Sequence, residues 1–469
     1  MKEPMLVLLP GREKSLLRRH VWIFSGAVAA LEGEAAPGET VVVTDSKRRF
    51  LARAAWSPES QLAARIWSFD PEETIDAAFF RRRIENAVEY RKFLGLDAPE
   101  GGCRLVHSEG DALPGLIVDR YGEYLVVQFL STGVEHFRAE IVAALQAATG
   151  AKGIYERSDV GVRAKEGLPE RSGLLAGAEP PNPLVITENG AKFAVDVRHG
   201  QKSGFYFDQR DSRRAVREFA AGRRVLNAFS YTGGFGVAAA LAGAEHVVNI
   251  DSSAPALKLA RHNMEMNRIP PERYENREAD VFGELRRFAE EGRKFDLVVL
   301  DPPKFIESQR ALTRGCRAYQ DIARLGFGLL APGGLLFQLL LFGADDAGAV
   351  PEDHGRRGGR SRGARPARRA SRTGAGPPDR AGGAGRLLPE GPGHANLSNR
   401  RNRHSGGQRA VRKTSPAGSR GASRRPNVKP SGAGGTGSYS FPPRRRRSRH
   451  KSELSVPHGY RVLPSRLSA

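Results

Sequence analysis

Residues 227–236, Asn-Ala-Phe-Ser-Tyr-Thr-Gly-Gly-Phe-Gly, decide the fold class of this chain. They follow the apolar run Arg224–Ala228 and precede a helical pattern that begins at Gly236, so a strand, a glycine-rich turn and a helix are predicted in succession. Glycine lets a backbone approach a ligand closely, and the first N–H groups of a helix face outward. Such turns also serve nicotinamide cofactors or only make tight corners, so the motif alone leaves its role open.

Strand and helix patterns alternate around this turn. They start with a hairpin whose Asn189-Gly190 pair suits a two-residue type I′ turn. The predicted strands are 184–188, 192–197, 224–228, 246–251, 295–301 and 334–341, and the predicted helices begin at Gly236, Pro255 and Tyr319. Alternation of this kind builds a doubly wound parallel sheet, so the sequence predicts an α/β domain over residues 184–341.

Acidic residues close three strands, which are the predicted strands that end at 251 and 301 and a strand between them that should end at Asp280. Asp251 follows Gly233 by 251 − 233 = 18 residues, where a carboxylate can accept hydrogen bonds from both ribose hydroxyls. Asp280 is suitably placed to receive an adenine amino group, and Asp301 opens an Asp-Pro-Pro-Lys turn whose prolines make it rigid. One such acid is more often a helix cap than a ligand contact. Four strand ends in this order nevertheless predict a single nucleoside pocket.

Two further domains are predicted ahead of the parallel sheet. Short β-prone runs at 41–44, 50–56 and 62–67 indicate a small β-barrel or half-barrel over residues 1–70. Helical and strand patterns then mix, which predicts an α+β domain over 71–183 that ends in a proline-rich linker.

A basic strip near the N-terminus precedes two aromatic residues, Trp22 and Phe24. The strip consists of Arg12, Lys14, Arg18, Arg19 and His20. Cations beside aromatic rings can contact phosphates and stack on unpaired bases. Composition alone favours the plainer interpretation, a solvated surface next to core aromatics.

The positive charge of the chain is confined to its tail. Of 74 Lys+Arg and 52 Asp+Glu, residues 1–340 hold 46 and 45, a net charge of +1, and residues 341–469 hold 28 and 7, a net charge of +21. Residues 342–469 are a low-complexity basic tail with almost no apolar periodicity. We expect this tail to be disordered, because it cannot bury enough surface to offset its ordering entropy.

Cysteine content and hydropathy exclude several classes of protein. With only Cys103 and Cys316, one chain can build neither a disulfide framework nor a multi-cysteine metal site, and no metal is expected. No signal-like segment and no apolar run of about 18 residues occurs. We expect a soluble, cytoplasmic protein with no membrane partner.

The motifs NAFSYTGGFG, NIDSS, READVF and DPPKF, preceded by GQKSGFYFDQRDSR, resemble those of the RlmI-type 23S rRNA (cytosine-5) methyltransferases. GREKSLLRRHVWIFSGAV resembles that family's PUA domain, and CRLVHSEGDALPGLIVDRYG its central domain, so the resemblance covers about residues 8–337. It implies a class I (Rossmann-like) methyltransferase sheet behind a PUA domain. It also implies S-adenosylmethionine as cofactor and 23S ribosomal RNA, free or partly assembled, as partner; a homodimer stays open.

The resemblance also assigns roles to residues. Phe229, Ser230, Gly233 and Gly234 would flank the methionine part of the cofactor, Asp251 and Ser252 the ribose, Asp280 the adenine, and Asp301 the sulfonium side as the catalytic residue. The substrate-binding residues would be Lys14, Arg18, Arg19, Gln209, Arg210, Pro302 and Lys304.

One expected group is missing. Methyl transfer to carbon 5 of cytosine needs a thiolate that adds to carbon 6. In the family this cysteine lies in a Ser-Cys-Ser motif after the fifth strand, where this chain reads Phe-Gln-Leu-Leu-Leu-Phe at 337–342. Cys103 and Cys316 are better interpreted as structural thiols. Lys304 stands where amino-methylating enzymes have a tyrosine, and lysine cannot stack on a base.

A frame slip near Phe337 accounts for the missing motif as a hypothesis. Codons for residues 338–346, read from the second base, can yield Ser-Cys-Ser-Cys-Ser-Gly-Leu-Met. On this hypothesis the tail is out-of-frame, the chain is impaired and the sheet has an unpaired apolar edge. A genuine basic tail that binds RNA is the competing interpretation. A catalytically silent RNA-binding protein and a methyltransferase for another RNA position stay open as alternative functions.

Overall fold

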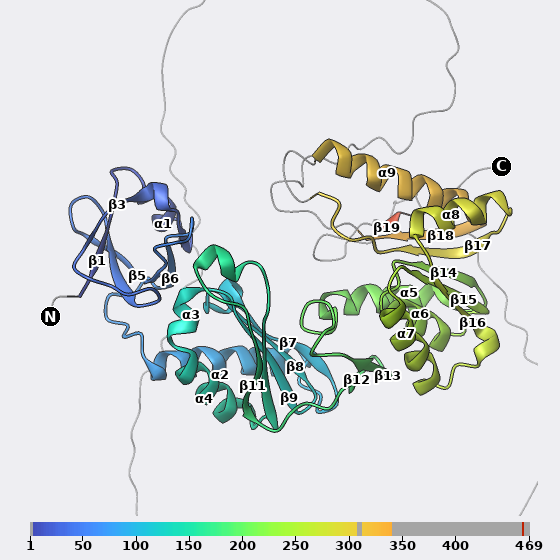
Figure 1. Cartoon of the computed structure of the whole chain (residues 1–469), viewed down its shortest axis with the longest axis horizontal. Coiled ribbons are helices and arrows are strands. Elements are labelled where there is room, and N and C mark those ends of the chain that lie inside the picture. The colour runs from blue at the N-terminus through green and yellow to red at the C-terminus, as the bar shows by residue number, and fades with distance from the viewer. Residues whose placement is uncertain (1–2, 307–311, 340–461, 464–469) are drawn as a thin grey trace, which may run out of the picture. The chain divides into compact units, whose positions relative to one another are not determined.

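The computed structural model describes residues 3–306, 312–339 and 462–463 (Figure 1). Its first sheet has the order β2-β6-β5-β4-β1-β3. The strands are β1 (Met5–Leu8), β2 (Trp22–Ile23), β3 (Val28–Glu32), β4 (Thr40–Thr44), β5 (Phe50–Trp56) and β6 (Ala64–Ser68), with the short helix α1 (Lys14–Leu17). β1 pairs in parallel with β4, and the other neighbours are antiparallel. Alternate residues of these strands, such as Leu6, Leu8, Val41 and Val43, form a small apolar core.

The second sheet has the order β11-β10-β9-β8-β7. Its strands are β7 (Gly102–His107), β8 (Leu116–Tyr121), β9 (Tyr124–Phe129), β10 (Gly153–Ser158) and β11 (Arg171–Gly177). Helices α2 (Ala77–Phe93) and α4 (Arg138–Thr149) cover one face, where their apolar residues share a core with β7, β8 and β9 (Figure 1). The backbone breaks at Phe137, which separates α4 from a short preceding helix α3 (Thr132–His136).

A two-stranded hairpin follows, formed by β12 (Leu184–Glu188) and β13 (Ala191–Val195). Its two turn residues have positive φ, 50° at Asn189 and 78° at Gly190. This is the backbone of a type I′ turn, which Asn-Gly favours. The hairpin prediction is therefore confirmed.

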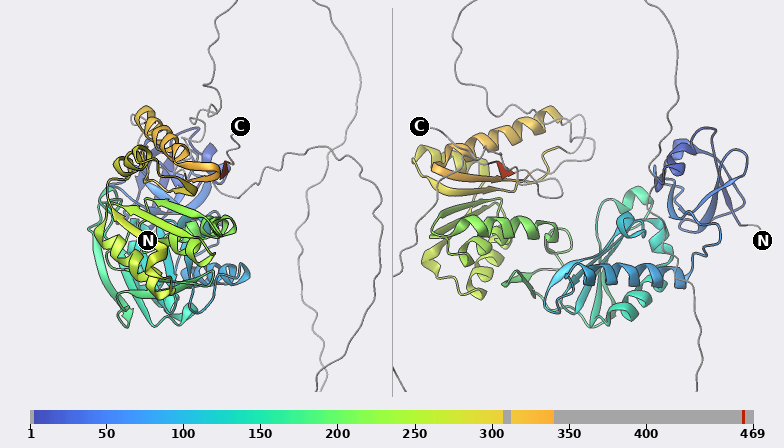
Figure 2. Two further views of the ribbon diagram at one scale, coloured as in Figure 1. Left: turned by 90° about the vertical axis from the view of Figure 1, so that its right-hand side faces the viewer. Right: turned by 180° about the vertical axis from the view of Figure 1, so that it is seen from behind.

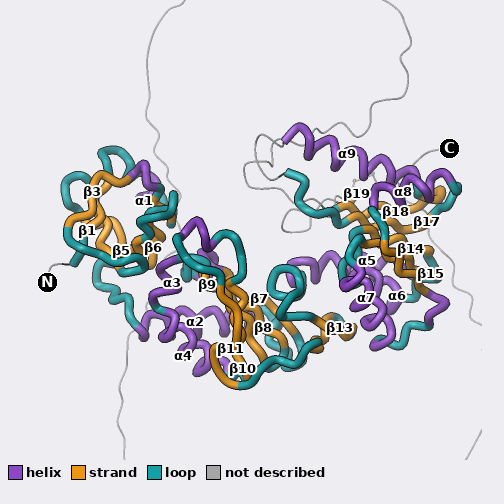
Figure 3. The backbone as a smooth tube through the Cα atoms, in the orientation of Figure 1, coloured by secondary structure: helices purple, strands orange, loops and turns teal. Residues whose placement is uncertain are grey.

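The third large sheet has the order β16-β15-β14-β17-β18-β19, and its first five strands run parallel. The parallel strands are β14 (Arg224–Ala228), β15 (His246–Asp251), β16 (Tyr274–Glu278), β17 (Phe295–Leu300) and β18 (Leu330–Gln338). Helices α5 (Arg210–Ala220), α6 (Gly234–Leu241) and α7 (Ala254–Met266) pack on one face. Helices α8 (Val281–Glu290) and α9 (Leu312–Gly328) pack on the other (Figures 1 and 2). Strands and helices alternate along the chain (Figure 3), so the α/β prediction is confirmed.

The structure corrects in part the expectation that this sheet has an unpaired edge. Residues Val462–Leu463 form β19, which pairs antiparallel with Phe337 and Leu336 of β18. This covers part of the edge with backbone hydrogen-bonding groups. The rest of the tail, and with it the expectation of disorder, lies outside the described residues. Within the described part of the chain, no helix has the length and apolar character needed to span a membrane.

Candidate cofactor and active site

The glycine-rich turn between β14 and α6 is tied to the end of β15. The parallel register pairs Ala228 with Ile250, which brings the carboxyl ends of the two strands together. The carboxylate of Asp251 then accepts hydrogen bonds from the backbone N–H of Tyr231 at 2.7 Å and from that of Ser253 at 3.0 Å. Tyr231 has a φ of 49°, a left-handed conformation that is sparsely populated by non-glycine residues. Asp251 therefore stabilises a strained turn.

A cavity of about 370 Å³ opens at this edge of the sheet. Of the site residues predicted from the sequence, its lining includes Gln209, Phe229, Ser230, Gly234, Asp251, Ser252, Asp301, Pro302 and Lys304. These residues come from the ends of β14, β15 and β17 and from the segment before α5. Ligands of doubly wound sheets bind at the carboxyl ends of the strands, which is where this cavity lies.

Of the site residues predicted in the parallel-sheet domain, three lie outside the lining of this cavity. Gly233 has a φ of 78° and packs on α7, because an added Cβ would lie 3.0 Å from the Cβ of Ala260. Asp280 caps α8, since its Oδ2 accepts from the N–H of Gly283 at 2.7 Å. Arg210 donates to the carbonyl oxygen of Gly102 and so links α5 to β7.

Asp301, directly after β17, has an unusually high pKa for a carboxyl group. Burial, together with the negative charge of Asp208, raises its pKa from 3.8 to about 7, although Arg213 and Lys202 lower it in part. The Nε2 of Gln209 donates to Oδ1 of Asp301 at 3.5 Å. A carboxyl group with a pKa near neutrality can both donate and accept a proton, which is the behaviour of a general acid–base group.

Much of the cavity wall comes from residues 201–208, none of which was among the predicted site residues. Gln201, Lys202, Phe205, Tyr206 and Asp208 all line the cavity. The hydroxyl of Tyr206 donates to Oε1 of Gln201 at 2.6 Å, and burial raises the pKa of Tyr206 to about 12. The sequence did contain a signal for these residues, because they lie within the GQKSGFYFDQRDSR motif. Of that motif, only Gln209 and Arg210 were predicted to be site residues.

The polar groups of the cavity fit S-adenosylmethionine. Ser230 Oγ and Gln209 Oε1 are buried and have no hydrogen-bond partner among the described residues. A serine hydroxyl can donate to the carboxylate of the methionine moiety, and an amide oxygen can accept from its ammonium group. The ring of Phe229 offers apolar surface beside them, as expected for a small-molecule site.

The basic strip near the N-terminus is solvent-exposed. Lys14 begins α1, Arg18 caps its end, and Arg19 follows with a φ of 63°. Trp22 is 37% exposed and Phe24 is 51% exposed, so these rings are not core aromatics. Both rings border a cavity of about 340 Å³ that Arg12 also lines. The interpretation of a plain surface beside core aromatics therefore does not hold for the rings.

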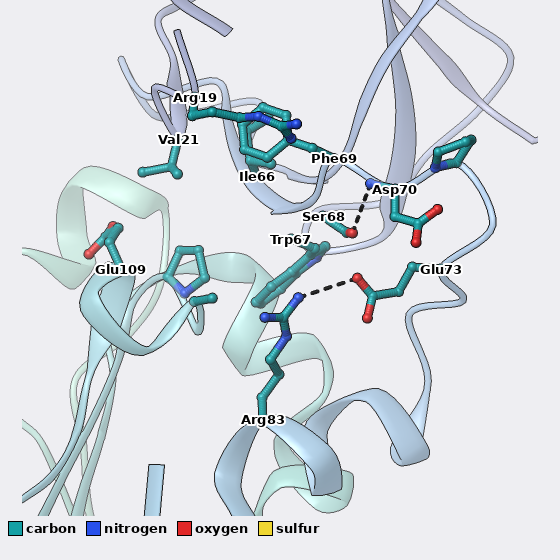
Figure 4. A pocket seen from close by; sticks show the side chains of 13 residues that line it. Arg19, Val21, Ile66, Trp67, Ser68, Phe69, Asp70, Glu73, Arg83 and Glu109 are labelled. Atoms are coloured by element: carbon teal, nitrogen blue, oxygen red, sulfur yellow. Dashed lines mark hydrogen bonds and ion pairs between the residues drawn. The ribbon is translucent and has the colours of Figure 1, made fainter. Parts of the chain in front are cut away.

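Arg19 also lines a cavity of about 580 Å³ between β6 and α2 (Figure 4). Its guanidinium lies 4.7 Å from the centre of the Phe69 ring. The same wall carries Arg83, whose Nη2 lies 3.3 Å from Oε2 of Glu73. Because both signs of charge line this cavity, its field is mixed and does not favour a polyanion.

Fold and site together define a class I S-adenosylmethionine-dependent methyltransferase with an N-terminal PUA-like domain. A family model described as S-adenosylmethionine-dependent methyltransferase matches residues 120–353, and one described as PUA-like domain matches residues 6–69. The ribosomal RNA large subunit methyltransferase I of Erwinia tasmaniensis is 51% identical over 331 residues, which are 71% of this chain and 84% of that protein. Those of Yersinia pseudotuberculosis and Cronobacter sakazakii are 50% identical over the same shares. The chain belongs to the ribosomal RNA large subunit methyltransferase I family, and its cofactor is S-adenosylmethionine.

Solved structures agree with this assignment. A putative methyltransferase from Streptococcus mutans is 26% identical with a TM-score of 0.61 and covers 71% of this chain and 85% of its own. A second putative methyltransferase, complexed with SAH, is 25% identical with a TM-score of 0.62 over the same shares.

Proposed function

We propose that this protein transfers the methyl group of S-adenosylmethionine to carbon 5 of a cytosine in 23S ribosomal RNA. The observation that carries the proposal is the position of Asp301, whose pKa is near 7, at the wall of the cofactor-sized cavity. The names of the relatives, which are large-subunit ribosomal RNA methyltransferases, support the substrate class. A cytoplasmic location is part of the same proposal.

Several of the predicted site residues have a role in this proposal. Asp251 binds the ribose, and Ser230 and Gln209 bind the methionine end. Asp280 contributes to the adenine site with the carboxylate oxygen that does not cap α8. The cofactor supplies an electrophilic methyl group. When protonated, Asp301 can donate a hydrogen bond to a ring nitrogen of the target base, and when ionised it can accept a proton.

The exposed basic strip near the N-terminus is the proposed RNA-binding surface. Lys14, Arg18 and Arg19 would bind phosphates, and Trp22 and Phe24 would stack on unpaired bases. Their exposure supports this assignment, because stacking needs free ring faces. Pro302 and Lys304, which line the cavity beside Asp301, would contact the substrate, and Arg210 links the start of α5 to β7.

We further propose that the chain as written is impaired in this transfer. The thiolate must reach carbon 6 of the base while carbon 5 faces the methyl group. The backbone N–H of Leu339 donates to the carbonyl oxygen of Leu300 at 2.8 Å, so position 339 adjoins Asp301. The shifted reading frame places cysteines at positions 339 and 341, and the first of these is the position that adjoins Asp301. Cys103 is no substitute, because it is buried in β7 and burial raises its pKa.

A methyl-transfer assay with radiolabelled cofactor and 23S ribosomal RNA tests both proposals. The frame-corrected protein should form 5-methylcytosine, and Asp301→Ala should abolish the product. The chain as written should bind the cofactor but transfer at least about a hundredfold more slowly, since it lacks the nucleophile. Methylation of another nucleoside by the corrected protein would overturn the carbon-5 assignment, and full activity of the chain as written would overturn the impairment.

A catalytically silent RNA-binding protein is the second candidate. Leucine at both positions where the shifted frame has cysteine, 339 and 341, favours it for the chain as written. Cofactor binding and RNA binding without methyl transfer, even after frame correction, would support this function.

A further inference from the structure

One wall of the cavity is anchored by residues that lie outside the parallel sheet. The segment between β13 and Phe207 supplies Gln201, Lys202, Phe205 and Tyr206 to the lining. Among the described residues that line the cavity, none belongs to the second sheet. The contacts of this segment nevertheless lead to β8 and β10, both strands of the second sheet.

A chain of buried hydrogen bonds connects the segment to β8. The N–H of Phe205 donates to the hydroxyl oxygen of Tyr121 at 3.1 Å, and that hydroxyl lies 2.9 Å from Ser203 Oγ. Ser203 in turn donates to Oδ2 of Asp119. Arg104 donates to both oxygens of Asp119, at 2.8 and 2.9 Å. Ser203 is 1% exposed and both Tyr121 and Asp119 are 0% exposed, so water does not compete for these groups.

The direction of these bonds follows from the carboxylate at their end. An ionised aspartate only accepts, so the hydroxyl proton of Ser203 points to Asp119. The Tyr121 hydroxyl must then donate to Ser203, and its oxygen is free to accept from Phe205. This order needs a neutral phenol, and burial beside Asp119 raises the pKa of Tyr121 well above its usual value. Each donor in the chain therefore has one acceptor.

A second anchor holds the start of the same segment. Arg157 on β10 donates from Nη1 to the carbonyl oxygen of Val197 at 2.8 Å and from Nη2 to that of Gly200 at 3.3 Å. Its Nε is held by Asp159 at 2.9 Å. Arg157 is 6% exposed, so this anchor is also shielded from solvent.

The opposite side of the segment contacts the glycine-rich turn. The N–H of Gln201 donates to the hydroxyl oxygen of Tyr231 at 2.9 Å. Space is tight here, since a Cβ at Gly200 would lie 2.3 Å from the carbonyl oxygen of Asp196 and 3.0 Å from the Tyr231 hydroxyl. The segment is thus fixed between the second sheet and the cofactor turn.

We propose that Asp119, Tyr121 and Ser203 form a positioning clamp through which the second sheet holds residues 196–206 in the shape that binds S-adenosylmethionine. The inference rests on the proposed assignment of the cavity to this cofactor. Without the clamp, the segment samples many conformations, and binding must restrict them again. Loss of the clamp therefore lowers the affinity for the cofactor, although the three side chains do not touch the cofactor.

The test measures cofactor affinity and segment mobility in the full chain. Tyr121→Phe keeps the buried ring and removes only the hydroxyl, and Ser203→Ala removes the next link. Ser158→Ala is the matched control, because Ser158 is a 0% exposed serine of β10 whose Oγ accepts from the N–H of Phe129, away from the segment. Calorimetry with S-adenosylmethionine and S-adenosylhomocysteine gives Kd, and hydrogen exchange reports on the amides of residues 199–206.

We expect Tyr121→Phe and Ser203→Ala each to raise Kd about tenfold and to speed exchange of the segment. The double variant should be little worse than either single variant, because both remove links of one chain. Ser158→Ala should lower thermal stability but change Kd less than about twofold. These fold changes are order-of-magnitude expectations for losing one buried link.

Two outcomes distinguish failure of the clamp from failure of the site. If Asp251→Ala weakens cofactor binding but Tyr121→Phe and Ser203→Ala leave Kd and exchange unchanged, the clamp is wrong and the cavity assignment stands. If Asp251→Ala binds the cofactor normally, the cavity assignment itself is wrong. Equal loss of affinity in Ser158→Ala would show general destabilisation and would also overturn the clamp.

Discussion

The side chains of Gln209 and Asp301 meet at 3.5 Å across the candidate cavity, although 92 residues separate them in the chain. Gln209 ends the turn Phe207–Gln209, and Asp301 follows β17. The contact joins the segment before α5 to the end of a central strand. It places a neutral amide beside a carboxyl group whose pKa is about 7, so the protonation of Asp301 controls the polarity of this wall.

Asp301→Asn should stabilise the protein at alkaline pH. Between about pH 4 and 7 the unfolded state has released a proton that the folded state keeps, so stability falls as pH rises through this window and levels off above it. Removing the carboxylate removes this loss, which the size of the pKa shift limits to at most about 4 kcal/mol at pH 8. Thermal unfolding from pH 4 to 8 measures the effect.

Asp296→Asn, in the strand β17 that Asp301 follows, is the matched control. The guanidinium of Arg224 lowers the pKa of Asp296, so its stabilising effect is present at neutral pH and is lost as pH falls through that lowered pKa. The two variants should therefore shift stability in opposite directions at pH 8. A shift of the same sign in both would contradict the assigned pKa of Asp301.

Variants of Asp280 distinguish its role as a helix cap from its proposed role in cofactor binding. Asp280→Ala should lower stability by about 1 kcal/mol, because the N–H of Gly283 loses its acceptor. Asp280→Ser keeps a capping oxygen and should restore most of that stability. If the adenine assignment is right, both variants should still bind S-adenosylmethionine several-fold more weakly. Unchanged affinity in Asp280→Ser would remove this residue from the cofactor site.

Gly233→Ala should destabilise the turn before α6. Its φ of 78° disfavours any L side chain, and an added Cβ would lie 3.0 Å from the Cβ of Ala260. Gly243→Ala is the control, because Gly243 has a φ of 89° but no atom within 4 Å of an added Cβ. We expect losses of about 1 kcal/mol for Gly243→Ala and about 2 kcal/mol for Gly233→Ala. Equal thermal shifts would mean that α7 does not restrict this position.

The ion pair of Arg65 and Glu166 should stabilise the contact between the first sheet and the second. The guanidinium binds both carboxylate oxygens at 2.8 and 2.9 Å, and the side chains are 9% and 2% exposed. Arg65→Met alone should cost about 3 kcal/mol, because Glu166 is left charged and buried. The double variant Arg65→Met with Glu166→Met should recover part of this loss. Urea unfolding and cofactor Kd are the measurements, and the latter should not change.

Local patterns were sufficient for the elements of the parallel sheet. The Asn189-Gly190 turn, the strand before Phe229 and the acids at 251 and 301 could be predicted, because strand periodicity and turn chemistry depend on neighbours within a few residues. Parallel strands also place their carboxyl ends together, so the order of motifs along the chain was enough to predict a site at one edge of the sheet.

The composition of the site could not be predicted in the same way. Gly233 and Asp280 were predicted to bind the cofactor but contact α7 and the backbone of α8, whereas Lys202 and Tyr206, which were not predicted, line the cavity. The type of turn leaves open which way each side chain points. That direction is decided by the packing of the helices that follow.

The sequence by itself determined the order of strands and helices, the glycine-rich turn and the acidic strand ends, since each depends on short-range geometry. Only the tertiary structure decided that Ser203 bonds to Asp119, 84 residues earlier, and that Asp301 is buried enough to keep its proton near pH 7. Partners so distant in sequence are selected by the packing of whole sheets, and pKa depends on the solvent that this packing excludes.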